Sequence, residues 1–174
     1  MAADEYGLPD ACKRPLIMAL VAVPEAGLGA AELCVAYSLP PLLREGEELW
    51  GFFRVCGARL AGLFGDVPAL LSSPERLDQF CALPFAAVRV WLRLDGLVVH
   101  SESCVLLALT TWVRQNKPDV ARLTELVYDV RVSHLSQPYL RDVLPHLDWF
   151  NDGLAAVRGG GYLFRRGDER HDTR

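Results

Sequence analysis

The chain has 174 residues, of which 51% are hydrophobic and 23% are charged, and its formal net charge is −4. This composition is ordinary for a globular protein of one domain, or of one domain and part of a second. The arginines between Arg165 and Arg174 are interrupted by acidic residues. A nucleic-acid-binding face needs a concentrated basic footprint, so the composition argues against nucleic acid as a partner.

The five cysteines form no C-x-x-C pair, and most lie inside apolar stretches. An odd number of cysteines in such settings favours reduced, structural thiols, which are typical of a cytoplasmic or nuclear protein. The apolar run from Leu16 to Val23 superficially resembles a signal peptide, but the residues before it are acidic and Pro24 follows it. This run is too short to span a bilayer, so we expect no membrane association.

The sequence predicts an all-α fold of about six to eight helices, because no convincing run of alternating residues predicts a strand. Residues 1–27 form an N-terminal segment that is expected to be partly loose, although residues 16–23 could be a buried helix or a strand. A short helix is predicted from about Leu28 to Ser38, and Pro40-Pro41 is expected to end it.

The next predicted helix, from Glu47 to Phe64, has a clear apolar stripe. Its members recur at helical spacing and are Leu49, Phe52, Phe53, Cys56, Leu60, Leu63 and Phe64. Acidic residues at its start suit the helix dipole. Gly51, Gly57 and Gly62 each weaken the helix by about 1 kcal/mol relative to Ala, so it needs tertiary packing.

Further helices are predicted from capping residues and apolar spacing. Ser73-Pro74 and Ser136 with Pro138 are typical helix starts, and Leu83-Pro84 begins another helix. Four helices are therefore expected over residues 73–81, 83–92, 123–130 and 136–145. Between them, the helix that begins at Ser101 is apolar all round and is expected to be the buried hub of the domain. Residues 147–150 are expected to form a final packing turn before a flexible tail.

No convincing catalytic, cofactor-binding or metal-binding residues emerge from the sequence. The four histidines have no second ligand at i+3 or i+4, so they do not predict a metal site. Cys104 near His100 would suit thiol chemistry, but Cys104 is better explained as a small apolar residue of a buried helix. The chain is therefore not expected to be an enzyme. A polar cleft with a perturbed titratable group would support the alternative of a small helical enzyme.

The tryptophans fall into two groups. Trp91 and Trp112 lie on apolar stripes and are expected in the core. Trp50 lies off the stripe of its helix, where it could anchor a partner protein or pack on a neighbouring helix.

A series of short motifs resembles the helical BACK domain of BTB-BACK proteins when taken in order. These motifs are Phe64-Gly65-Asp66-Val67, Leu83-Pro84, Leu94-Asp95, Val99-His100-Ser101-Glu102, Val105, Ala108, Trp112-Val113, Leu126-Val127, Val130-Arg131, Leu135-Ser136 and Tyr139-Leu140. The segment from Ala30 to Pro40 resembles the helix that ends a BTB domain and leads into BACK.

The resemblance implies a domain organisation. Residues 28–44 would be a remnant of the BTB C-terminal helix, residues 45–150 a BACK-like helical domain, and residues 151–174 a flexible tail. The BTB core is expected to be missing, and a homodimer is expected only if such a core is present. The helix from Glu47 to Phe64 would be the first BACK helix, which in these adaptors is part of the 3-box and adds to the cullin-3 contact surface.

The resemblance also implies a function. It predicts a protein-interaction scaffold that resembles the BACK part of substrate adaptors for cullin-3 ubiquitin ligases, with cullin-3 and a ubiquitination substrate as partners and no cofactor. The expected protein-binding residues are Trp50, Arg54 and Arg59 on the first BACK helix. The alternative is a helical interaction or structural module without a ubiquitin-ligase link.

Overall fold

The computed structural model describes residues 27–44 and 46–159, and this part of the chain contains ten α-helices and no strand. The predicted all-α class is therefore confirmed. The helices are α2 (Ala30–Tyr37), α3 (Pro41–Arg44), α4 (Trp50–Phe64), α5 (Val67–Ser72), α6 (Pro74–Cys81), α7 (Phe85–Leu92), α8 (Glu102–Asn116), α9 (Val120–Asp129), α10 (Gln137–Asp142) and α11 (Asp148–Gly159). Short 3-10 turns occur at Glu47–Leu49, Val132–His134 and Leu144–His146.

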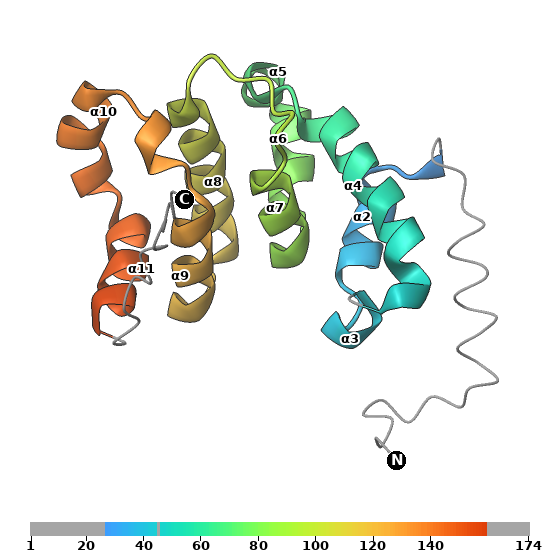
Figure 1. The fold of residues 1–174 in the computed structure, drawn as a ribbon. Helices are drawn as coiled ribbons and strands as arrows, with labels where there is room; N and C mark the ends of the chain where they lie inside the picture. Colours follow the sequence, from blue (N-terminus) through green and yellow to red (C-terminus); the bar gives the residue numbers. More distant parts are fainter. Residues whose placement is uncertain (1–26, 45, 160–174) are drawn as a thin grey trace, which may run out of the picture.

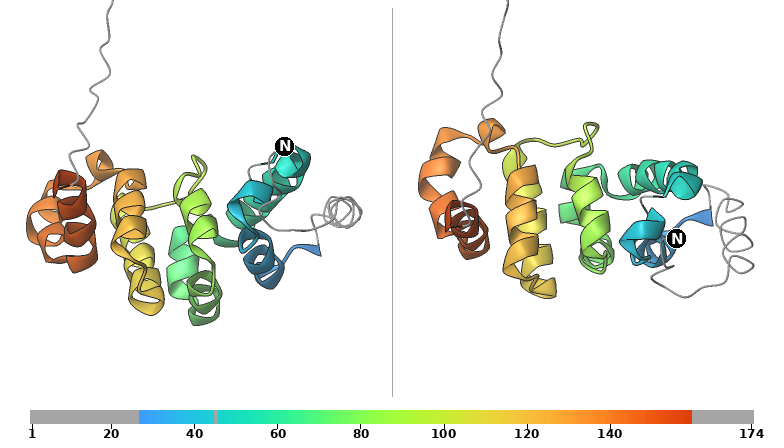
Figure 2. Two further views of the ribbon diagram at one scale, coloured as in Figure 1. Left: turned by 90° about the horizontal axis from the view of Figure 1, so that it is seen from below. Right: turned by 60° about the horizontal axis from the view of Figure 1, so that its bottom comes forward.

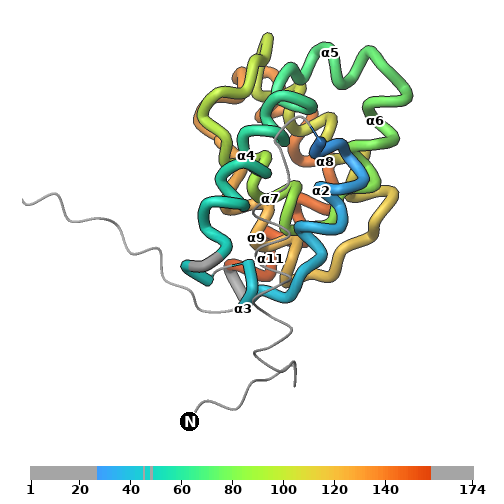
Figure 3. The backbone as a smooth tube through the Cα atoms, turned by 90° about the vertical axis from the view of Figure 1, so that its right-hand side faces the viewer, coloured from blue at the N-terminus to red at the C-terminus, as the bar shows by residue number. Residues whose placement is uncertain are grey.

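The helices are stacked in chain order, with α2, α3 and α4 at one end of the molecule and α10 and α11 at the other (Figure 1). The two views of Figure 2 show the same row of helices from other sides. Each group contacts the next: α4 packs on α7, α7 on α9, and α9 on α11, while α5 and α6 pack on α8. The end-on view of Figure 3 shows α2, α3 and α4 in front of α9 and α11.

Several helix starts follow directly from side-chain capping. Asp66, Ser73, Asp119 and Ser136 each accept a hydrogen bond from the backbone N–H three residues later, which satisfies an otherwise unpaired donor. Proline occupies the first or second helical position after three of these four caps, where its missing N–H costs nothing. The predicted starts at Ser73 and Ser136 are confirmed.

Three tryptophans connect neighbouring helices through their indole N–H groups. Trp91 of α7 is fully buried and donates to the carbonyl of Phe64 at 2.9 Å, at the end of α4. Trp112 of α8 donates to the carbonyl of Leu83 at 2.9 Å. In the same way, the indole of Trp149 in α11 donates to the hydroxyl of Thr110 in α8 at 3.0 Å. Each indole therefore combines a large apolar contact with a satisfied polar group, and the core positions predicted for Trp91 and Trp112 are confirmed.

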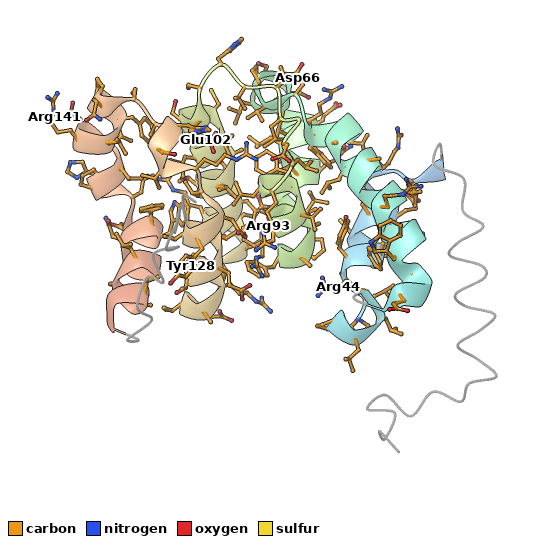
Figure 4. All side chains as sticks on the ribbon, in the orientation of Figure 1. Arg44, Asp66, Arg93, Glu102, Tyr128 and Arg141 are labelled. Atoms are coloured by element: carbon orange, nitrogen blue, oxygen red, sulfur yellow. The ribbon has the colours of Figure 1, made fainter. Side chains whose placement is uncertain are left out.

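The α7–α9 contact also contains a cluster of ion pairs. Arg89 of α7 and Arg93, the residue that caps the end of α7, lie one turn apart, and each donates to a different carboxylate oxygen of Asp129 at 2.9 Å. Arg89 also pairs with Glu125. The Asp129 side chain is only 11% exposed, so these partners offset the cost of removing its carboxylate from water. Figure 4 shows Arg93 between α7 and α9.

The sequence pattern did not predict α3, α5 or the full length of α11. Pro40-Pro41 was expected only to end a helix, but Pro41 begins α3, because proline is tolerated in a first helical turn. No helix start was predicted at Asp66, but its side chain caps α5. The central helix α8 is also less enclosed than predicted, since Leu107 is 54% exposed.

The expected boundary at residue 150 lies too early. Helix α11 continues to Gly159, and the buried Val157 extends its apolar face beyond Phe150. Gly153 lies where α11 meets α9, and a Cβ there would be 2.9 Å from the carbonyl oxygen of Leu123. The absence of a side chain at Gly153 therefore allows α11 to pack closely on α9. The tail predicted for residues 160–174 and the segment over residues 1–26 lie outside the described residues.

Replacing Gly153 with Ala is expected to destabilise the domain by about 2 kcal/mol, because the new methyl group would overlap backbone atoms of α9. Urea denaturation followed by circular dichroism measures this change. The control is Gly57→Ala in α4, where a Cβ meets nothing within 4 Å. That variant is expected to gain about 0.5 kcal/mol of stability. Equal effects of the two substitutions would contradict the close α9–α11 contact.

Replacing Asp129 with Ala is expected to lower the free energy of unfolding by about 2 kcal/mol, because Arg89 would lose its less exposed carboxylate partner. The matched control is Asp142→Ala, which removes an exposed pair with Arg141 at 2.7 Å. The control is expected to cause no measurable change, since water and salt screen such pairs. If both variants unfold at the wild-type urea concentration, the ion-pair cluster does not stabilise the α7–α9 contact.

Candidate protein-interaction surface

The exposed side of α4 forms a continuous surface near one end of the molecule. Trp50, Arg54, Ala58 and Gly62 follow each other at intervals of four residues, and all four are exposed. This spacing places them on one side of the helix. The opposite side carries the buried Phe52, Cys56, Leu60 and Phe64. We call the exposed set, Trp50, Arg54, Ala58 and Gly62, the α4 outer face.

Trp50 is the most exposed large aromatic side chain of this surface. Its exposed fraction is 69%, the highest among the large apolar residues of the described chain. The guanidinium carbon of Arg54 lies over the Trp50 ring, 5.9 Å from its centroid. Such a cation–π contact restricts both side chains without burying the ring. Within the described residues Trp50 is exposed and does not pack on a neighbouring helix, while its role as an anchor stays a prediction.

Arg59 has a different environment from Trp50 and Arg54. Its Nε donates to the carbonyl oxygen of Leu28 at 2.8 Å, and the Leu28 side chain is 2% exposed. Arg59 therefore ties the backbone that precedes α2 to the middle of α4. The structure brings Trp50 and Arg54 together, while Arg59 lies apart from them and makes an internal contact.

The glycines of α4 have no steric role within the described structure. A Cβ at Gly51, Gly57 or Gly62 would meet nothing within 4 Å. No internal packing contact therefore explains why these positions lack side chains, although each glycine weakens the helix. Their effect on the surface is to leave the backbone of α4 open to close approach.

The His, Cys, Asp and Glu side chains of the described residues do not gather into a metal-binding cluster. No group of three or more His, Cys, Asp or Glu residues could hold a metal ion within residues 27–44 and 46–159. Burial raises the pKa of the Cys34 and Cys81 thiols, and it raises that of Cys56 to about 11. Thiols of this kind are mostly protonated at neutral pH and are weak nucleophiles. Cys104, by comparison, has the Ser101 hydroxyl as a neighbour at 3.8 Å.

A groove of about 580 Å³ lies between the α2–α3 end and helices α7, α8 and α9. The sequence singled out neither this groove nor its arginines, Arg44 and Arg122. These two residues are far apart in the chain, and neither belongs to a recognisable motif. Only the tertiary structure brings them to the same groove.

Comparison with known proteins identifies one family. The model of the BACK domain (BTB And C-terminal Kelch) matches residues 75–145, from α6 to the turn that follows α10. The chain therefore contains a BACK domain of the kind found in BTB-BACK proteins. This domain is a non-catalytic module, and its family implies interactions with other proteins. No curated protein and no solved structure matches the chain.

None of the helices described here has the length and apolar character needed to cross a membrane.

Because Arg54 and Arg59 have different environments, their replacement is expected to affect the stability of the domain differently. Arg59→Ala is expected to lower the free energy of unfolding by about 1 kcal/mol, because the Leu28 carbonyl would lose its charged donor. Arg54→Ala is expected to leave stability unchanged within error, because its partner is an exposed ring. Parallel urea titrations measure both. A destabilised Arg54 variant would indicate that the α4 outer face has a structural role.

Proposed function

We propose that this chain is a protein-interaction scaffold that acts as the BACK part of a BTB-BACK substrate adaptor for cullin-3 ubiquitin ligases. The observation that carries the proposal is the BACK match over residues 75–145. In this proposal residues 28–44 correspond to the end of a BTB domain, and the BACK-like unit begins at residue 45, before the matched region. An adaptor of this kind acts by proximity, so the chain itself needs no catalytic residue or cofactor. We expect it to act in the cytoplasm or nucleus.

The α4 outer face is the proposed cullin-contact surface. Helix α4 precedes the matched region, where the 3-box helix of such adaptors is expected. Tryptophan and arginine are the residue types most enriched among those that dominate binding energy at protein interfaces. Trp50 offers a large apolar surface, and its contact with Arg54 reduces the side-chain entropy lost on binding. The neighbouring glycines would allow a partner helix to approach the α4 backbone.

Arg59 contributes to this proposal indirectly. Its bond to the Leu28 carbonyl holds the segment before α2 against α4. Loss of Arg59 is therefore expected to weaken partner binding only to the extent that it disturbs α4, whereas loss of Trp50 would remove a contact.

The test measures binding of the cullin-3 N-terminal domain to the full chain, alone and fused behind a BTB core, by biolayer interferometry. We expect the fusion to bind, and Trp50→Ala in the fusion to weaken binding at least about tenfold. The matched control is Tyr128→Ala on α9, which removes another exposed aromatic ring, 53% exposed, from a different surface. This control is expected to bind like the unchanged fusion.

The outcomes of this test distinguish an adaptor of cullin-3 ligases from a helical interaction module. Binding by the chain alone would make α4 sufficient for recruitment, and binding by the fusion alone would make this chain the supporting part of an adaptor. Equal binding of the Trp50 variant and its parent would remove the α4 outer face from the proposal. If the fusion adds nothing to the binding of the BTB core by itself, the chain is a helical interaction module with no ubiquitin-ligase link.

A further inference from the structure

We propose that the groove between the α2–α3 end and helices α7–α9 binds an acidic segment of a partner protein, with an apolar side chain of that segment against the groove wall. This site is separate from the α4 outer face and does not depend on cullin binding.

The groove has a rigid apolar wall. Phe85 at the start of α7 and Trp112 of α8 lie next to each other, with ring centroids 6.4 Å apart. The indole N–H of Trp112 donates to the Leu83 carbonyl, which fixes the ring in place. Prolines line the groove from three segments: Pro40 and Pro41, Pro84, and Pro118. Aromatic rings and prolines lose little conformational entropy on binding, so this wall is preorganised for an extended apolar side chain.

Two arginines give the groove a positive character although the whole chain carries a net charge of −4. Arg44 enters from α3, and its Nε donates to the Leu39 carbonyl at 2.9 Å, which orients the guanidinium. Figure 4 shows Arg44 between α3 and α7. Arg122 enters from α9 and lies over the Phe85 ring, 5.5 Å from its centroid. Asp119 is 3.8 Å from Arg122, but no carboxylate is among the described residues that line the groove.

The backbone adds a second source of positive potential. The eight-residue helix α7 begins at Phe85, and its N-cap, Pro84, provides no side-chain hydrogen bond. Phe85 and Ala86 both line the groove, so the uncapped end of the helix dipole lies at its wall. Free N–H groups at such an end favour a carboxylate.

Tyr37 is part of the groove wall, but its hydroxyl is buried. Its side chain is 4% exposed and lines the groove, and its hydroxyl has no hydrogen-bond partner within the described part of the chain. The hydroxyl itself is closed to solvent, so it lies behind the groove wall and does not face a bound segment. Burial, with a further contribution from Cys56, raises the pKa of Tyr37, while Arg44 opposes the rise. The hydroxyl therefore remains uncharged at neutral pH and does not reduce the positive character given by the arginines.

These features together fit an acidic peptide. The two arginines and the α7 N-terminus would bind carboxylates. The Phe85–Trp112 wall would take a leucine or an aromatic side chain from the same segment. The groove volume of about 580 Å³ is of the size that holds several side chains.

The test is selection of a random twelve-residue peptide display library on the immobilised full chain. We expect enrichment of peptides that combine Asp or Glu with a leucine or aromatic residue. A synthetic copy of the most enriched peptide, labelled with fluorescein, then gives dissociation constants by fluorescence anisotropy. The double variant Arg44→Gln, Arg122→Gln is expected to bind it at least about tenfold more weakly, and binding is expected to weaken with increasing salt.

The matched control is Arg76→Gln, Arg114→Gln, which removes the same charge from exposed arginines that do not line the groove. It is expected to bind the peptide like the unchanged chain. Equal losses in both double variants would indicate a general charge effect and overturn the site. Selection of peptides without acidic residues would also overturn it. Urea titration of each variant separates loss of binding from loss of folding.

Binding of the cullin-3 fusion is measured in parallel with these variants. The groove substitutions are expected to leave it unchanged, and Trp50→Ala is expected to leave peptide binding unchanged. Failure of one proposal is therefore distinguishable from failure of the other.

Discussion

The hydrogen bond from the buried Trp91 indole to the Phe64 carbonyl is the contact on which the arrangement of the other helices depends. It joins the end of α4 to the last turn of α7 at the point where the chain turns into α5. The Trp91 ring also packs on Phe80 of α6, with centroids 4.7 Å apart, and Phe80 packs on Phe64. Because the indole N–H is fully buried, it needs this one acceptor, and few other placements of α4 on α7 would provide it.

A different kind of contact, a set of ion pairs, positions α9 against α7. Arg89 and Arg93 both bind Asp129 of α9, and the geometry of this pair fixes the rotation of α9 relative to α7. Apolar packing alone would allow neighbouring helices to slide, whereas hydrogen-bonded charges have a defined direction. Helix α11 packs closely on α9 because Gly153 has no side chain at their contact. Two arginines, one aspartate and one glycine thus contribute the contacts that hold α9 against α7 and α11.

The two proposed binding surfaces lie near the same end of this row and use helices that the core contacts hold in place. The α4 outer face is opposite the side of α4 that meets the core, so its residues are not required for packing. The groove forms where the α2–α3 end meets α7, α8 and α9, so its shape depends on the Trp91 and Asp129 contacts. A scaffold with separate surfaces could bind two proteins at once, which is the requirement for an adaptor that acts by proximity.

The sequence by itself determined the all-α class, most of the helices and the core positions of Trp91 and Trp112, because apolar spacing and capping residues are local signals. It also contained the motifs of the BACK domain. It did not reveal α3, α5 or the length of α11. Proline and glycine end helices in some contexts, but in others proline begins a helix and glycine allows a helix to pack closely. Tertiary structure alone decided that Arg59 binds the Leu28 carbonyl while Arg54 stays exposed, and that Arg44 and Arg122 share a groove. Those outcomes depend on contacts between segments that are far apart in the sequence, and local sequence patterns do not specify such contacts.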